Sequence, residues 1–152
     1  MDRTPPHRLP AARSSAAASG TVRRRLALAA AAAATVALGL LVHFLVAGGF
    51  WSLVADALYT VLIYLVLALI APAAGKVKLA VAAFAASALV ELTQLTGIPH
   101  QLAQDFPPSR LILGTTFSAL DLAAYAAGAA AVCCADRVHP HQGARWRPAQ
   151  TE

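Results

Sequence analysis

The chain alternates between four long apolar runs and short polar segments. The runs cover about residues 26–47, 52–71, 79–98 and 117–135. Each is close to the roughly 20 residues that an α-helix needs to cross the hydrocarbon core of a bilayer. A soluble core of short amphipathic elements does not give uninterrupted apolar runs of this length. The pattern therefore predicts an all-α, polytopic membrane protein folded as a bundle of four transmembrane helices.

Glycine and proline mark the boundaries of these runs. Gly48 follows the first run, Pro72 the second and Pro99 the third. Ser52 is expected to cap the second helix, because a serine oxygen can accept a hydrogen bond from a free amide of the first turn. Residues 99–116 are expected to form the only long loop, and loops of that length in compact proteins are often functional.

The two ends of the chain differ from its apolar middle. Residues 1–25 contain six arginines and three prolines but little that could be buried, so a disordered basic tail is expected. Residues 136–152 are expected to form a second polar tail. In that tail His139 and His141 make an H-x-H pair, which we interpret as incidental. We expect neither a metal ion nor another cofactor.

Composition supports the membrane assignment. Hydrophobic residues make up 59% of the chain and charged residues 12%, against about half and a quarter in soluble proteins. With 152 residues, four spans and two tails leave no room for a second domain. A secretory signal peptide is an alternative reading of the N-terminal arginines and the first apolar run. That run is longer than a signal core, and three further spans would keep the protein in the membrane.

The positive charges predict how the bundle is oriented. Lysines and arginines beside a span resist translocation, so they mark the cytoplasmic side. Placing both ends of the chain inside (N-in/C-in) puts eleven of the twelve basic residues there, with Arg110 as the exception. Basic residues at the membrane surface attract anionic headgroups. The expected partners are therefore membrane lipids and not nucleic acid, for which the sequence offers no folded basic face.

Four ionisable side chains lie inside the predicted spans. They are His43, Asp56, Glu91 and Asp121, one in each span. A charged group near the bilayer centre costs roughly 2.5–3.5 kcal/mol, so each needs a reason to be there. At a rise of about 1.5 Å per residue, all four lie within roughly 6–10 Å of the outer helix ends. The spacing predicts that they converge in the outer half of the membrane.

Further polar side chains share helix faces with these groups. Gln94 follows Glu91 by three residues, and Tyr125 follows Asp121 by four, which places each pair on one face. Arg110 is expected to fold over the carboxylates and pair with Glu91 or Asp121. Such a cluster could bind a proton, a cation or an amine, or could only join the helices by hydrogen bonds. The expected cluster comprises Asp56, Glu91, Gln94, Arg110, Asp121, Tyr125 and His43.

Several short motifs follow one another in a characteristic order. E-L-T-Q occupies residues 91–94, R-L-I-L-G residues 110–114, and F-S-A-L-D-L-A-A-Y-A-A-G residues 117–128. With Asp56 before them, these motifs resemble the bacterial membrane-protein family catalogued as domain of unknown function 2809 (DUF2809), over roughly residues 26–135. The resemblance implies a multi-pass protein of the bacterial plasma (inner) membrane. It implies no activity, because none is established for the family.

A more distant resemblance is to VanZ-like proteins, which carry E-x-x-Q and D-x-x-x-N-x-x-G in their last two helices. Glu91 with Gln94 and Asp121 with Gly128 match these motifs, whereas Tyr125 stands where the asparagine would be. A contact that depends on that amide therefore does not carry over. The resemblance points only to a role in the cell envelope.

Three classes of function fit these features. The favoured one is a binding or accessory membrane protein whose outward-facing acidic pocket holds a cationic, amine or lipid-headgroup ligand. The second is a small proton- or cation-coupled transporter, acting as a homo-oligomer that pairs through small residues such as Ala124 and Gly128. Few polar groups in the inner halves of the spans argue against it. The third is an intramembrane acid/base enzyme, which lacks a nucleophile beside a base.

Overall fold

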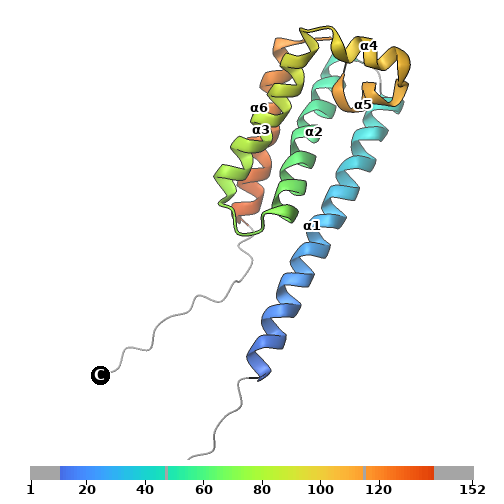
Figure 1. Ribbon diagram of the computed structural model, residues 1–152. Helices are drawn as coiled ribbons and strands as arrows, with labels where there is room; N and C mark the ends of the chain where they lie inside the picture. Colours follow the sequence, from blue (N-terminus) through green and yellow to red (C-terminus); the bar gives the residue numbers. More distant parts are fainter. Residues whose placement is uncertain (1–10, 47, 115, 139–152) are drawn as a thin grey trace, which may run out of the picture.

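Helices make up nearly all of the described chain. The computed structural model describes residues 11–46, 48–114 and 116–138, with side chains from residue 20 onward. The long helices lie side by side, and short helices cover one end of the bundle (Figure 1). In chain order, the elements are α1 (Ala11–Leu45), α2 (Gly49–Ile70), α3 (Lys76–Gln94), α4 (Ile98–Asp105), a 3-10 turn (Pro107–Ser109), α5 (Arg110–Leu113) and α6 (Ala119–Val138).

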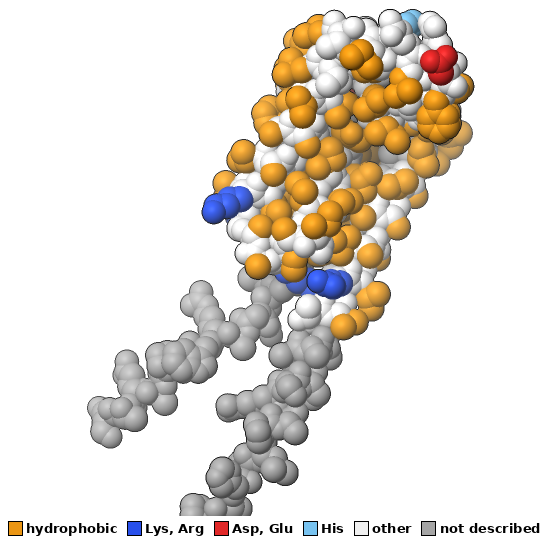
Figure 2. Space-filling view, in the orientation of Figure 1, with side chains coloured by type: hydrophobic (Ala, Val, Ile, Leu, Met, Phe, Trp, Pro, Cys, Tyr) orange, Lys and Arg blue, Asp and Glu red, His pale blue; other side chains and the backbone are white. Residues whose placement is uncertain are grey.

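The four long helices each contain a stretch that is long and apolar enough to cross a membrane. These stretches are Gly20–Leu45, Gly49–Ile70, Lys76–Gln94 and Ala119–Val138. The prediction of an all-α, polytopic membrane protein with four spanning helices is thereby confirmed. Apolar side chains cover the sides of the bundle, and basic side chains gather toward one end (Figure 2). Such a surface suits the hydrocarbon core of a bilayer.

The first helix is longer than expected. It begins at Ala11, so part of the segment that we expected to be a disordered tail is helical. Alanine and arginine are among the strongest helix formers, and they dominate residues 11–25. Residues 1–10 and 139–152, with the His139 and His141 pair, lie outside the described residues.

The connection between the third and fourth spans also differs from the expectation of a long loop. α3 ends at Gln94 because Gly97 turns the chain with a φ of 73°, a conformation that favours glycine. Pro99 lies in the first turn of α4, where its missing N–H costs nothing. α2 begins earlier than expected, with Gly48 at its N-cap in place of Ser52.

Three of the long helices form the core of the bundle. α2, α3 and α6 each pack against the other two, whereas α1 packs against α2 alone among the described helices. The α2–α6 contact is tight, because a Cβ on Gly128 would lie 3.1 Å from Ala57 Cα and still closer to its carbonyl oxygen. Ala124 is buried as well. The small face expected to pair two copies of the chain is therefore occupied by the chain's own α2.

The two ends of the bundle differ in charge, and we name them accordingly. The basic end is where α2 ends and α3 begins, and it carries Arg24, Lys76 and Arg137. The acidic end is covered by α4 and α5, and Asp56, Glu91 and Asp121 all lie in the turns nearest to it. Both ends are fixed by hydrogen bonds that involve titratable side chains.

Candidate functional site

Glu91 is completely buried although it is ionisable. Its exposed fraction is 0%. One carboxylate oxygen accepts a hydrogen bond from the backbone N–H of Ser118 at 2.5 Å, and the other accepts one from the Tyr125 hydroxyl at 3.1 Å. These bonds join the last turn of α3 to the beginning of α6. Glu91 therefore fixes two core helices to each other at the acidic end.

Two further carboxylates lie near Glu91, each on a different helix. Asp56 of α2 and Asp121 of α6 are half-buried. The charges of Asp121 and Glu91 act on Asp56, and all three act on the Tyr125 hydroxyl. Because like charges repel, a bound cation or proton would lower the free energy of this group. We call Asp56, Glu91 and Asp121 the acidic cluster.

The polar atoms beside the acidic cluster include acceptors without donors. Asp56 Oδ2 and Gln94 Oε1 are buried and have no hydrogen-bond partner among the residues that the structure describes. The Gln94 side chain is held at its other atom, because Nε2 donates to Leu113 O at 2.7 Å. Gly114 follows with a φ of 62°, and a Cβ there would lie 2.5 Å from that Nε2. The loop at Leu113 and Gly114 therefore packs closely against the Gln94 side chain. The unpaired oxygens of Asp56 and Gln94 favour a ligand that donates hydrogen bonds.

Arg110 does not occupy the position that the sequence suggested. It begins α5 and is exposed. Within the described residues the only ion pair joins Lys76 to Asp136, so Arg110 pairs with neither Glu91 nor Asp121. The physical reason is that donors on and just before α6 already satisfy both Glu91 oxygens. The expected closure of the cluster by Arg110 is therefore not found.

His43 also lies apart from the acidic cluster. It is exposed on α1 and packs edge-on against Phe44, with ring centroids 5.0 Å apart. With Trp51 and Ser52 of α2 it lines a hollow of about 220 Å³ at the acidic end. Of the seven residues expected in the cluster, the structure brings together Asp56, Glu91, Asp121 and Tyr125. Gln94 follows Glu91 on α3, and its side chain is held by the loop at Leu113.

A buried hydrogen bond between two hydroxyl groups occupies the middle of the bundle. Thr60 Oγ1 and Ser87 Oγ lie 2.8 Å apart, and both side chains have an exposed fraction of 0%. Thr60 follows Asp56 by one helical turn, and Ser87 precedes Glu91 by one turn. Sequence reasoning missed Ser87, although its spacing from Glu91 was a signal for it.

The basic end contains a second polar network that we did not expect. The Tyr64 hydroxyl donates to Asp136 Oδ2 at 2.8 Å, and Lys76 forms an ion pair with Oδ1 at 3.4 Å. Lys76 also donates to the backbone carbonyl of Asp136. Arg24 donates to Pro72 O at 3.0 Å, which ties α1 to the turn after α2. The halves of the helices toward the basic end are therefore less apolar than the sequence pattern suggested.

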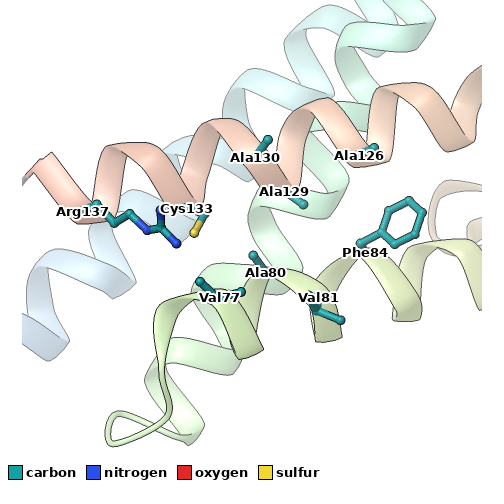
Figure 3. A pocket seen from close by; sticks show the side chains of 9 residues that line it. All are labelled: Val77, Ala80, Val81, Phe84, Ala126, Ala129, Ala130, Cys133 and Arg137. Carbon is teal, nitrogen blue, oxygen red and sulfur yellow. The ribbon is translucent and has the colours of Figure 1, made fainter.

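An apolar groove runs between α3 and α6, away from the acidic cluster. Its volume is about 270 Å³, and Val81, Phe84 and Cys133 are among its lining residues. Arg137 is its only charged lining residue and lies toward the basic end (Figure 3). The groove has the apolar walls that suit an acyl chain, whereas the acidic cluster has the groups that suit a cation.

Metal binding is a further use that clustered carboxylates can have. Within the part of the chain that the structure describes, no three histidine, cysteine or carboxylate side chains are grouped closely enough to hold a metal ion.

The comparisons with known proteins give one match, to a protein family. The model of a family described as "Protein of unknown function (DUF2809)" matches residues 46–129, which is more than half of the chain. The match runs from just before α2 into α6 and includes the acidic cluster, whereas α1 lies before it. No match was found among curated proteins or among solved structures.

Proposed function

The chain belongs to the DUF2809 family, and we propose that it binds a cationic, amine-bearing ligand at the acidic cluster. The ligand is a small amine or the amine of a lipid headgroup. We also propose that the protein lies in the bacterial plasma membrane with both chain ends in the cytoplasm. The acidic cluster then lies in the outer half of the bilayer.

This proposal rests on an excess of hydrogen-bond acceptors over hydrogen-bond donors at the acidic end. Within the described part of the chain, Asp56 Oδ2 and Gln94 Oε1 are buried without hydrogen-bond partners, and a buried acceptor without a donor costs about 1–3 kcal/mol. An ammonium group offers three N–H donors and a positive charge. It would satisfy these oxygens and offset the repulsion among the three carboxylates.

Aromatic rings beside the cluster also support an organic cation. Tyr125 contacts Glu91, and Tyr59 packs near Tyr125 with ring centroids 6.5 Å apart. The face of an aromatic ring attracts ammonium groups within about 6 Å. Asp56 lies seven residues into α2, about 10 Å along the helix axis. That depth is within reach of a headgroup or a small amine that enters from the interface.

Binding can be measured with defined probes on the purified full-length protein in nanodiscs. We expect n-butylammonium to raise the thermal unfolding temperature more than tetramethylammonium, which has no N–H donor. Asp56→Asn should abolish the difference, and Asp105→Asn, a change at an exposed carboxylate, should preserve it. At ten times the dissociation constant the gain would be about 1.4 kcal/mol. Equal responses of wild type and Asp56→Asn to both probes would refute the proposal.

The source of the amine can be distinguished in the same system. Nanodiscs of phosphatidylethanolamine should stabilise the protein relative to phosphatidylcholine if a headgroup is the ligand, because only the former has N–H donors. If soluble butylammonium acts equally in both lipids and the lipid alone has no effect, the ligand is a free amine.

The proposed orientation has its own test. In a background with Cys133 and Cys134 replaced by alanine, single cysteines at the exposed positions 73 and 104 report on the two ends of the bundle. An impermeant maleimide should label position 104 in intact cells and leave position 73 unlabelled. The reverse labelling would place the acidic end in the cytoplasm.

A further inference from the structure

Polar side chains occur at several depths in the interior of this apolar bundle. The largest side chains that are fully buried are Tyr64, Glu91, Thr60 and Ser87. Every one of them can donate or accept a hydrogen bond. Helices in lipid need only small residues and a few hydrogen bonds to associate, so four buried polar side chains along one axis go beyond that need.

These side chains are arranged in three levels along the bundle axis. Each level is a hydrogen-bonded pair that joins two of the core helices. From the acidic end to the basic end, the pairs are Glu91 with Tyr125, Thr60 with Ser87, and Tyr64 with Asp136.

The spacing between levels follows from the helix repeat. On α2, Asp56, Thr60 and Tyr64 follow one another at intervals of four residues, and on α3 Ser87 and Glu91 do the same. Four residues rise about 6 Å. One water molecule that makes two hydrogen bonds of about 2.8 Å covers nearly this distance. Along α2 and α3, successive levels are thus one helical turn apart, a gap that one or two water molecules can bridge.

We propose that this line of hydroxyl and carboxyl groups carries protons between the acidic cluster and the basic end. The inference rests on the proposed function at its acidic end and extends it from binding to exchange across the membrane. The objection that the inner halves of the helices lack polar groups no longer holds, because Thr60, Ser87, Tyr64 and Asp136 provide them.

The proposed transfer leaves every relay group unchanged. A cation that binds the acidic cluster displaces a proton from a carboxyl group there. Each hydroxyl along the line accepts a proton on its oxygen and gives its own proton to the next group or to the intervening water. Asp136 takes the last proton and releases it to water at the basic end, where Lys76 holds the carboxylate in place. One positive charge enters the cluster as one proton leaves it.

The route can be tested by removing its middle level while keeping the shape of the bundle. Thr60→Val with Ser87→Ala deletes both hydroxyls, and replacing both partners of a hydrogen bond by apolar groups of similar shape is nearly neutral for stability. Thr35→Val with Ser52→Ala is the matched control, because these hydroxyls lie on α1 and on the exposed face of α2.

The measurement is proton flux into liposomes that contain the purified protein and a trapped pH dye, driven by a potassium–valinomycin potential with butylammonium outside. We expect the wild type and the control to exceed empty liposomes, and the Thr60→Val/Ser87→Ala protein to lose at least tenfold of that flux. Tyr64→Phe, which removes only the phenolic oxygen, should show the same loss and keeps the test valid if the double variant does not fold. Unchanged flux in both variants, or wild-type flux no greater than that of empty liposomes, would overturn the route.

Failure of the route and failure of the ligand proposal give different results. If butylammonium stabilises the wild type but no protein-dependent flux occurs, the ligand proposal stands and the route is wrong. If flux depends on Thr60, Ser87 and Tyr64 but no amine stabilises the protein, the route stands and the ligand proposal is wrong.

Discussion

Each end of the bundle contains a carboxylate that accepts a hydrogen bond from a tyrosine, but the two ends differ in whether the carboxylate also has a positively charged partner. At the basic end Asp136 has a donor on each carboxylate oxygen, Tyr64 on one and Lys76 on the other. At the acidic end Glu91 accepts hydrogen bonds from two uncharged donors, and no ion pair reaches Asp56, Glu91 or Asp121 within the described residues. A fully paired carboxylate stabilises a fold, whereas grouped carboxylates without a counter-ion lower stability where function needs them. We therefore expect the basic end to stabilise the fold and the acidic end to serve the proposed exchange.

The largest expected effect comes from removing the one member of the acidic cluster that is fully paired. Glu91→Ala leaves the Ser118 N–H and the Tyr125 hydroxyl without an acceptor inside the bundle. At about 1–3 kcal/mol for each buried unpaired group, the free energy of unfolding should fall by about 2–6 kcal/mol. Equilibrium unfolding in mixed detergent micelles measures it.

Glu91→Gln is the matched control for this change, because it keeps an acceptor and nearly the same volume. It should cost less than half as much as Glu91→Ala. Equal losses for the two variants would mean that the carboxylate charge, and not the hydrogen bonds, holds α3 to α6.

A smaller loss is expected at the basic end. Asp136→Ala removes the acceptor of Tyr64 and the partner of Lys76. Because the site is only partly buried, we expect a loss of about 1–3 kcal/mol, below the 3–5 kcal/mol typical of a deeply buried pair. Asp105→Ala, an exposed carboxylate, should change the same unfolding measurement by less than about 0.5 kcal/mol. A loss at Asp136 no larger than this control would contradict a stabilising role for the basic end.

Replacing an aspartate by asparagine should change the free energy of unfolding in opposite directions at the two ends of the bundle. Asp56→Asn removes one of three repelling charges and supplies N–H donors, so it should raise the free energy of unfolding by about 0.5–1.5 kcal/mol. Asp136→Asn removes a charge that is paired and should lower it. If both substitutions destabilise the protein, Asp56 is a structural partner and the distinction between the ends fails.

The smallest effect is expected at Arg110. It is exposed and forms no ion pair in the described structure, so Arg110→Ala should alter the free energy of unfolding by less than about 0.5 kcal/mol. The sequence alone had suggested a pair with Glu91 or Asp121. A measured loss of unfolding free energy above about 2 kcal/mol would show that Arg110 does pair with one of these carboxylates.

Periodic features of the chain could be predicted from the sequence. Apolar length predicts the four spanning helices, and depth and helix face predict that Asp56, Glu91 and Asp121 meet. These quantities follow from the fixed rise and turn of an α-helix. Ser87 could have been found in the same way, because it lies one turn from Glu91.

Features outside the helix repeat could not be predicted. Arg110 lies in a connection whose path depends on Gly97, Gly114 and three prolines, and the sequence pattern does not determine where such a segment directs a side chain. Asp136 lies at a boundary where the polar tail seemed to begin, although α6 continues to Val138. Boundaries and connections therefore account for most of the differences.

The polar face of α2 has a consequence for how the protein is made. Asp56, Thr60 and Tyr64 lie toward α3 and α6, which the ribosome produces later. When α2 is inserted these helices are still missing, whereas the hydrogen bonds of Thr60 and Tyr64 in the described structure go to α3 and α6. Polar groups without partners are costly in hydrocarbon. The nascent hairpin of α1 and α2 must therefore stay beside the insertion machinery, or in another polar setting, until α6 has been synthesised and closes the bundle.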